Sequence, residues 1–171
     1  MITLNIDRAN KQTAFVLIED STNEILDKGI IPNADFVKYA EETEYEVMNI
    51  EIVANMGLSG VSLYDTSEMV GVLSFIALNR NIALNRYKRH SIKKHMQVRN
   101  RRKINGQWVK PPSRDSQIRT SLIEKYGEVG TKKNQGYFYG FKADIWQAMA
   151  VYETYKNGID IPNDEFMLKG E

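Results

Sequence analysis

The sequence predicts one mixed α/β domain, and three observations favour this fold class. The chain has 171 residues, which suffice for one domain with a hydrophobic core and are too few for two comfortable ones. Hydrophobic residues make up 42% and charged residues 26% of the chain, which is typical of globular proteins and excludes a wholly disordered chain. Segments with strand-like alternation are followed by segments with helical spacing of apolar residues.

Three strands are predicted at the start of the chain. Apolar and polar residues alternate over 2–6, which predicts a strand that delivers Asp7 at its end. Residues 13–18 are rich in β-forming types and predict the second strand. The turn-forming residues 19–23 then allow residues 24–31 to pair back as the third.

The next segments predict a helix, a strand and a longer helix. Residues 33–40 have helical spacing after a proline, and residues 46–52 predict a buried strand with Glu51 near its end. Thr66 is expected to cap a long helix whose apolar residues occupy 69–83. This helix is apolar on more than one stripe, as expected if one face is core and another meets a second subunit. Burial on both sides within one chain is the alternative.

The second half of the chain predicts a short strand over 87–91 and helices over 116–126 and 141–155. Residues 97–114 have neither helical nor strand periodicity and predict a long basic loop, a kind of segment that is usually functional. Aromatic residues at 137–141 are expected to pack the loop before the last helix onto the sheet, with base stacking as the alternative.

The predicted domain spans residues 1–158. Residues 159–171, with four acids and a proline, are expected to form a mobile tail. The first residues show no basic region followed by an apolar stretch, and no segment approaches 18 consecutive apolar residues. We therefore expect a cytoplasmic protein without membrane contact.

Positive charge is concentrated in one segment. Residues 80–119 hold 13 Lys or Arg and one acid, Asp115, whereas the rest of the chain has a net charge of −11. A near-neutral total of +1 is therefore compatible with binding a polyanion. A solvated basic loop without a partner is the alternative. The residues that we expect to contact DNA are Arg86, Lys88, Arg89, Lys93, Lys94, Arg99, Arg101, Arg102, Lys103, Lys110 and Arg114.

Three acids stand at the ends of predicted elements: Asp7, Glu51 and Asp144. Clustered carboxylates raise one another's pKa values unless a cation lies between them, so such a cluster is most economically explained by Mg²⁺ or Mn²⁺. The chain has no Cys and only two His, which excludes a thiolate or His-rich metal site. The alternatives are a turn residue for Asp7 and an acid favoured by the helix dipole for Asp144.

The order of these elements and four stretches in the last third of the chain resemble the RuvC-type Holliday-junction resolvases. The resemblance is closest to the divergent branch carried by bacteriophages and prophages, and it spans about residues 2–156. The stretches that carry it are Ser113–Arg119, Leu122–Gly127, Gly136–Gly140 and Lys142–Val151. The resemblance implies an RNase H-like fold, a five-stranded mixed sheet flanked by helices, and a homodimer that presents two active sites to a four-way junction.

The resemblance also assigns roles to individual residues. It implies that Asp7, Glu51 and Asp144 hold the catalytic metal ions and that Lys93 assists at the scissile phosphate; one more non-specific phosphate contact is the alternative for Lys93. Bacterial members carry a fourth acid where this chain has Gln147, which we expect to ligate weakly through its carbonyl oxygen or to hold a water. Cellular members have an aromatic wedge after the catalytic Glu, and residues 52–58 contain no aromatic; Met56 and Leu58 are the candidates to replace it.

The implied function is a structure-selective endodeoxyribonuclease that resolves Holliday junctions and other branched DNA by paired phosphodiester hydrolysis. It would use two Mg²⁺ per active site, with Mn²⁺ as a substitute. A phage would need it in the host cytoplasm for DNA recombination, repair and debranching before packaging. The alternatives are a junction-binding protein with lost or weak catalysis, and another RNase H-like nuclease that acts on RNA–DNA hybrids or flaps.

Overall fold

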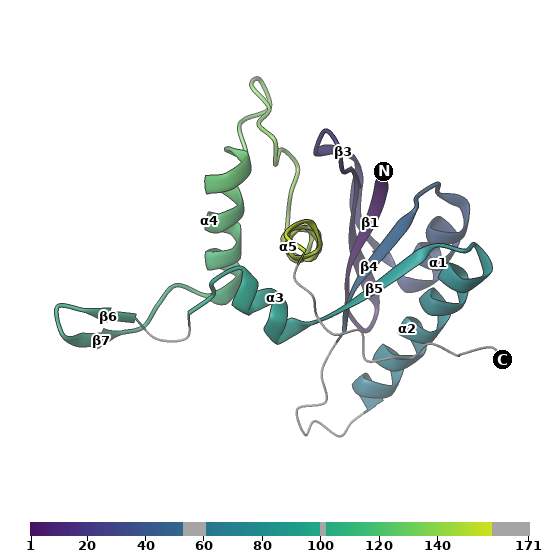
Figure 1. Ribbon diagram of the computed structural model, residues 1–171. Helices are drawn as coiled ribbons and strands as arrows, with labels where there is room; N and C mark the ends of the chain where they lie inside the picture. The colour runs from purple at the N-terminus through teal and green to yellow at the C-terminus, as the bar shows by residue number, and fades with distance from the viewer. Residues whose placement is uncertain (53–60, 100–101, 159–171) are drawn as a thin grey trace.

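The computed structural model describes residues 1–52, 61–99 and 102–158. In this part of the chain, a five-stranded sheet has helices on both faces, and a small two-stranded hairpin projects to one side (Figure 1). The elements in chain order are β1 (Ile2–Arg8), β2 (Gln12–Glu19), β3 (Glu24–Pro32), α1 (Asn33–Glu42), β4 (Val47–Ile52), α2 (Val61–Asn79), β5 (Ala83–Lys88), α3 (Arg89–His95), β6 (Arg102–Ile104), β7 (Gln107–Val109), α4 (Arg114–Tyr126) and α5 (Ile145–Lys156).

The strand order of the large sheet is β3-β2-β1-β4-β5. The strands β1, β2 and β3 form an antiparallel meander, whereas β4 pairs parallel with both β1 and β5. The carboxyl ends of β1, β4 and β5 therefore meet at one edge of the sheet. Residues that follow these strands are brought together there, although they are far apart in the sequence.

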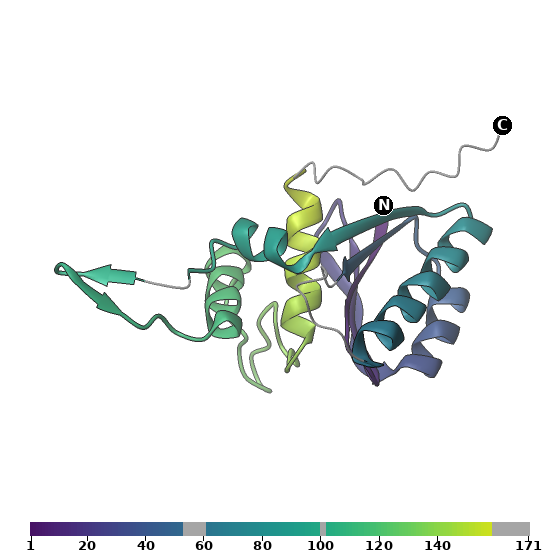
Figure 2. The same cartoon turned by 90° about the horizontal axis from the view of Figure 1, so that it is seen from below.

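Two hydrophobic clusters form the core, one on each face of the sheet. On one face α1 and α2 cover side chains such as Leu4, Ile6 and Ile50. On the other face α5 lies against β1, β2 and β4, and its residues from Ile145 to Thr154 are all buried. Figure 2 shows α5 between the sheet and α4, with α1 and α2 beyond the opposite face. A helix buried all round in this way is the centre of a layered α/β domain.

The four strands predicted before residue 53 and the helices over 33–40 and 116–126 are present, with bounds that differ by a few residues. The predicted helix over 69–83 is wrong at both ends: it begins at Val61, so Thr66 lies inside it, and it ends at Asn79. Asn81 has a left-handed backbone (φ 53°), and the amide of Ala83 then donates to the Glu46 carbonyl (3.2 Å). The apolar residues on the two sides of this turn therefore belong to two elements, the helix α2 and the strand β5.

The strand predicted over 87–91 is also shifted. The strand β5 ends at Lys88, and the helix α3 begins at Arg89. Ile92 and Met96 are buried in the α5 cluster, and the amide of Met96 donates to the Ile92 carbonyl (2.8 Å). Helical spacing of these two apolar residues therefore prevails over the short β-rich segment before them.

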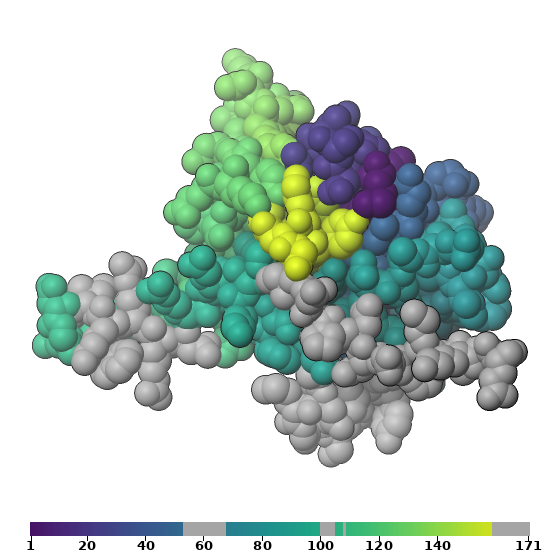
Figure 3. Space-filling view, viewed as in Figure 1, coloured from purple at the N-terminus to yellow at the C-terminus, as the bar shows by residue number. Residues whose placement is uncertain are grey.

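The predicted loop over 97–114 contains a hairpin of β6 and β7. Asn105 and Gly106 connect the two strands with positive φ angles of 49° and 81°, the conformation that two-residue hairpin turns favour. The described hairpin residues stand apart from the sheet at one end of the molecule (Figure 3). The flanking strands have only three residues each, too few for the Asn-Gly turn to stand out in the sequence.

The last helix, predicted over 141–155, begins later, at Ile145. Gly140 and Ala143 have positive φ angles of 82° and 41°, so the chain turns twice before the helix starts. None of the helices in the described residues is long and apolar enough to cross a membrane. The predicted tail over 159–171 and the wedge candidates Met56 and Leu58 lie outside the described residues.

Candidate active site

Two carboxylates, Asp7 and Glu51, lie at the carboxyl edge of neighbouring strands. Asp7 follows Ile6 on β1, Glu51 follows Ile50 on β4, and Ile6 and Ile50 are paired partners. Since side chains alternate along a strand, both acids belong to the face that α5 covers. Asp7 is 6% exposed and Glu51 is 4% exposed. Two acids that are buried together need a cation or a shared proton to stabilise them.

A ladder of asparagines aligns the strands that carry these acids. The Asn49 Nδ2 donates to the Asn5 Oδ1 (2.8 Å), and the Asn85 Nδ2 donates to the Asn49 Oδ1 (2.9 Å). Asn5 and Asn49 each precede an acid by two residues and therefore share its face of the sheet. The ladder joins β1, β4 and β5 and fixes their register. The ladder was not predicted from the sequence, although an asparagine two residues before each strand-end acid is its signal there.

The environment of the two acids favours their protonated forms. Burial, and after it the charge of Glu51, raise the pKa of Asp7 to about 8, although the Arg89 guanidinium opposes both effects. Burial likewise raises the pKa of Glu51, against the effect of Arg89. The metal-free pair therefore has more negative charge than its surroundings stabilise, and a proton or an added cation relieves the excess.

Arg89, the first residue of α3, forms ion pairs with both acids. Its Nε donates to the Glu51 Oε1, and its Nη2 lies 3.9 Å from the Asp7 Oδ1. Half of the Arg89 side chain is exposed, so it reaches the acids from the solvent side. Arg89, which the sequence analysis placed among the DNA contacts, is thus a counter-charge of the acidic pair in this structure.

Asp144, the third predicted acid, immediately precedes α5 and is exposed. Its charge raises the pKa of Asp7, so it is near enough to influence the buried pair. The turn before Asp144 is fixed by aromatic packing, as the sequence predicted. The Phe138 ring is fully buried, and its centroid lies 5.0 Å from that of Phe141 and 4.8 Å from that of Trp146.

The donor set of the site fits a hard divalent cation. Asp7 and Glu51 supply the carboxylate oxygens that such ions prefer, and their raised pKa values indicate a local excess of negative charge. Within residues 1–52, 61–99 and 102–158, no three Asp, Glu or His side chains are grouped closely enough to hold one ion. The buried pair is therefore the centre of the candidate metal site, and Asp144 is the additional acid whose charge reaches it.

A polar contact between two helices adds an acid that the sequence analysis did not assign to the site. The Gln147 Nε2, in the first turn of α5, donates to the Asp115 Oδ1 (3.1 Å), in the first turn of α4. The charge of Asp115 raises the pKa of both Arg89 and Lys93. Asp115 thus lies near the same group of charges as Glu51. In the sequence, Asp115 stands out only as the single acid of the basic segment 80–119.

Lys93, on α3, is partly buried beside the acids. Burial lowers its pKa, the positive charges of Arg89 and Arg114 lower it further, and Glu51 opposes these effects. A lysine close to both a buried carboxylate and other cations is well placed to contact an anionic group of a ligand. The structure therefore brings Lys93, Arg89 and Arg114 to the edge of the sheet where Asp7 and Glu51 lie.

The other predicted DNA contacts are distributed more widely. Arg86 belongs to the opposite face, because it is the partner of Ile50 on β4 and its Nη2 donates to the Ser74 Oγ (2.8 Å) on α2. Arg101 lies outside the described residues. The remaining residues are Lys88 at the end of β5, Lys94 on α3, Arg102 and Lys103 on β6, and the exposed Arg99 and Lys110 on the segments that lead into and out of the hairpin.

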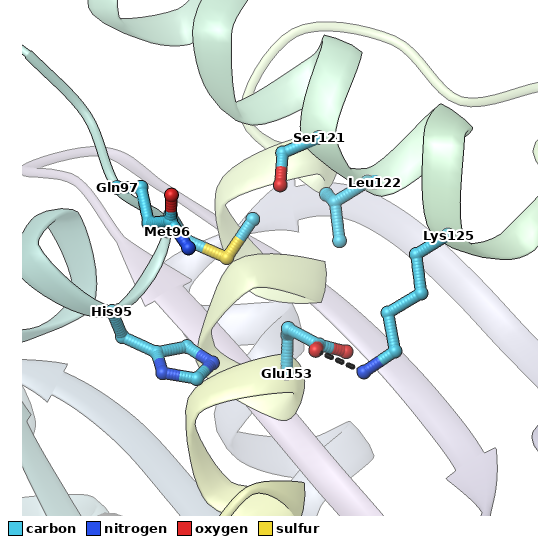
Figure 4. A pocket seen from close by; sticks show the side chains of 7 residues that line it. All are labelled: His95, Met96, Gln97, Ser121, Leu122, Lys125 and Glu153. Carbon is cyan, nitrogen blue, oxygen red and sulfur yellow. Dashed lines mark hydrogen bonds and ion pairs between the residues drawn. The ribbon is translucent and has the colours of Figure 1, made fainter.

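A small pocket of about 170 Å³ lies between α3, α4 and α5 (Figure 4). Glu153 of α5 is buried in its wall and forms an ion pair with Lys125 of α4. Glu153 also accepts hydrogen bonds from the Tyr126 hydroxyl (2.6 Å) and the Asn157 amide (2.8 Å). A buried carboxylate with this many partners ties α4 to α5. The pocket includes none of the predicted catalytic or metal-binding residues.

Among solved structures, the chain is similar to RuvC of Thermus thermophilus in complex with a Holliday junction substrate. The TM-score is 0.59 and the identity is 10%, and the match covers 90% of this chain and 91% of that chain. Another structure of Thermus thermophilus RuvC matches with a TM-score of 0.60 and 10% identity, over 90% of this chain and 92% of that chain. No family model and no curated protein matches the chain.

At 10% identity, this likeness concerns the fold. The predicted fold class is confirmed by the five-stranded mixed sheet, the helices on its two faces and the match over nine-tenths of the chain. The chain is a single RNase H-like α/β domain with a RuvC-like fold.

Proposed function

We propose that this protein is a divalent-metal-dependent endodeoxyribonuclease that resolves Holliday junctions and other branched DNA. The observation that carries the proposal is the buried pair of Asp7 and Glu51, at the strand edge of a RuvC-like fold, with Lys93, Arg89 and Arg114 nearby. Buried acids beside exposed cations are suited to hold metal ions next to a phosphodiester. The Holliday junction in the complex of Thermus thermophilus RuvC supports the choice of substrate.

In this proposal, Asp7 and Glu51 hold Mg²⁺, or Mn²⁺ in its place, together with Asp144 and the Gln147 carbonyl oxygen. Two such ions, when bound, would activate a water and neutralise the charge that develops on the phosphate. The chain's own groups prepare the site. Deprotonation of Asp7 exposes its full charge, Arg89 gives up its ion pairs with the acids, and the freed guanidinium contacts a phosphate of the bound strand.

Lys93 has a separate role in the proposed reaction. Its ammonium group donates hydrogen bonds to the scissile phosphate and orients it towards the acidic pair, as the resemblance implies. The charge of Glu51 interacts with Lys93, which is consistent with a position beside the reacting phosphate. The other basic residues of 80–119 bind the arms of the junction through phosphate contacts, with steep salt dependence.

We further propose that the protein acts as a homodimer through α2. Val72, Phe75 and Leu78 recur at three-residue intervals on this helix, and Phe75 is 62% and Leu78 is 71% exposed. Such a stripe of large apolar side chains on a helix that also packs against the core is typical of a subunit interface. Two protomers would cut two strands of one junction. The proposed setting is phage or prophage DNA recombination, repair and debranching in the cytoplasm, that of the host if the gene is phage-borne.

One observation favours a second candidate, a junction-binding protein with weak or lost catalysis. Gln147 supplies an amide where bacterial members of the family carry an acid, and the described residues contain no preformed group of three ligands. Another RNase H-like nuclease that cuts hybrids or flaps is the third possibility, since the fold does not determine the substrate.

The test is a cleavage assay with a labelled immobile four-way junction, a matched linear duplex and an RNA–DNA hybrid, with and without Mg²⁺ or Mn²⁺. We expect paired nicks near the crossover that require the metal ion and are absent in Asp7→Asn. Tight junction binding without nicks would support the binding protein instead. Preferential cleavage of the hybrid would overturn the choice of substrate and retain the nuclease chemistry.

A further inference from the structure

The side-chain amide of Gln117 makes three hydrogen bonds to the backbone at the base of the β6–β7 hairpin. Its Oε1 accepts from the Arg99 amide (2.9 Å), and its Nε2 donates to the Arg99 carbonyl (3.1 Å). The same Nε2 donates to the Pro112 carbonyl (2.9 Å). Both N–H donors of the Gln117 side-chain amide and its carbonyl oxygen are thus bonded to the backbone of two residues, Arg99 and Pro112.

These two positions bracket the hairpin. Arg99 precedes the segment 100–111 and Pro112 follows it, so both ends of the hairpin segment are bound to one side chain. The two carbonyl oxygens share a single donor nitrogen, which places them next to each other. One side chain thus holds the two ends of the hairpin segment together, which restricts how the segment can leave α4.

Gln117 itself is held by the core. It lies on α4 next to Ile118, which is buried with Leu122 in the cluster that contains α5. Further contacts tie α4 to α5, namely the hydrogen bond between Asp115 and Gln147 and the ion pair between Lys125 and Glu153. Gln117 therefore connects the hairpin to the helix that lies against the Asp7 and Glu51 strands.

The three hydrogen bonds of Gln117 hold the base of the hairpin at Arg99 and Pro112, next to Val98, which packs against the α5 cluster. A groove of about 440 Å³ runs beside Gln117 and is lined by Arg99, Pro112, Thr120 and Glu124, among others. Arg99 and Pro112 are exposed. Because open space adjoins Arg99 and Pro112, loss of the three hydrogen bonds should loosen both ends of the hairpin segment.

We propose that Gln117 is a positioning residue that sets the orientation of the basic hairpin relative to the acidic pair, and thereby the preference for branched over linear DNA. This inference rests on the proposed function. The hairpin carries Arg102 and Lys103 and projects from the body of the molecule (Figures 1 and 2). A fixed arm of positive charge matches a DNA arm in one geometry, whereas a swinging arm attracts any duplex by charge alone.

The decisive variant is Gln117→Met, which keeps the length of the side chain, adds no charge and removes all three hydrogen bonds. Thr120→Val is the matched control, because Thr120 lies one turn along α4 and lines the same groove. Hydrogen exchange of residues 99–112 reports on the clamp. The ratio of junction to duplex affinity reports on selectivity, and single-turnover cleavage at saturating DNA reports on the chemistry.

For Gln117→Met we expect faster exchange confined to residues 99–112 and a roughly tenfold lower affinity ratio, equivalent to about 1.4 kcal/mol. The fall should come mainly from weaker junction binding, while the maximal cleavage rate and the thermal midpoint stay close to those of the wild type. Thr120→Val should change none of these quantities.

Two results would overturn the proposal. Unchanged exchange at 99–112 would show that Gln117 does not hold the hairpin. Faster exchange with an unchanged affinity ratio would show that the clamp does not set selectivity. A wild-type protein that does not prefer junctions would refute the proposed function instead, so the two failures are distinguishable.

Discussion

Replacing Asp7 with asparagine should make the metal-free protein more stable at alkaline pH, because it removes an ionisable group from a buried acidic pair. The pKa of Asp7 rises from 3.8 in the unfolded chain to about 8 in the folded protein, chiefly through burial. Between these values the folded protein keeps a proton that the unfolded chain has released. The free energy of unfolding therefore falls as the pH rises through this window, and Asp7→Asn abolishes this contribution.

The magnitude follows from the size of the pKa change. A rise from 3.8 to about 8 corresponds to at most about 6 kcal/mol of destabilisation once Asp7 is fully ionised. The Arg89 guanidinium lies 3.9 Å from the Asp7 carboxylate and is half exposed, so it can approach the new charge, and water can enter with it. We therefore expect a net effect of about 2 kcal/mol between pH 5 and pH 9.

The assay is urea-induced unfolding in the presence of EDTA at pH 5, 7 and 9. The measured quantity is the difference in unfolding free energy between Asp7→Asn and the wild type, in which the titration of groups remote from Asp7 cancels. The unfolding free energy of Asp7→Asn minus that of the wild type should increase by about 2 kcal/mol from pH 5 to pH 9. Glu41→Gln, which alters an exposed acid on α1, should show no such trend. Parallel pH profiles for Asp7→Asn and the wild type would refute the assignment of Asp7 as a buried, destabilising acid.

Three further outcomes are expected. Mn²⁺ should raise the thermal midpoint of the wild type by several degrees at pH 8 and by less at pH 6, and should leave Asp7→Asn unchanged; equal shifts in both proteins would place the ion elsewhere. Phe75→Glu should convert a dimer into a folded monomer in light-scattering measurements, and a persistent dimer would exclude α2 as the interface. Asn49→Leu should lower the unfolding free energy by about 2 kcal/mol in urea titrations, because it leaves the partner groups of Asn5 and Asn85 unpaired; a neutral effect would argue against the ladder.

Much of the sheet could be predicted from the sequence because its strands have simple patterns. Alternation over 2–6 and the apolar segment that ends at Glu51 predicted two strands with an acid at each end. Parallel pairing of neighbouring strands then brings such ends to one edge, as the structure has it for Asp7 and Glu51. Strand-end position is a local property, so a local pattern can reveal it.

The features that were missed depend on tertiary contacts or on competing local signals. The contact between Asp115 and Gln147 joins residues that are 32 positions apart, and no periodicity marks either of them. The apolar residues around Asn81 fit a helix and a strand equally well, and only the pairing of Ala83 with β4 decides between them. Residues 89–95 became a helix because Ile92 and Met96 find buried positions against α5. In each case the deciding energy comes from packing that a single segment does not contain.

In the folded domain, the basic residues of the segment 80–119 fall into two groups with different surroundings. Arg89 and Lys93 reach the acidic pair from α3, while Arg102 and Lys103 belong to a hairpin that projects from the body. The first group compensates the charge of Asp7 and Glu51 when no metal ion is bound, whereas the second has no acid to neutralise on its own strand. A polyanion that binds the hairpin leaves the ion pairs of Arg89 intact, but to reach the acids it must displace Arg89. Binding and access to the acidic pair are therefore separate steps, and a divalent cation that replaces Arg89 at the carboxylates would free it for the phosphate.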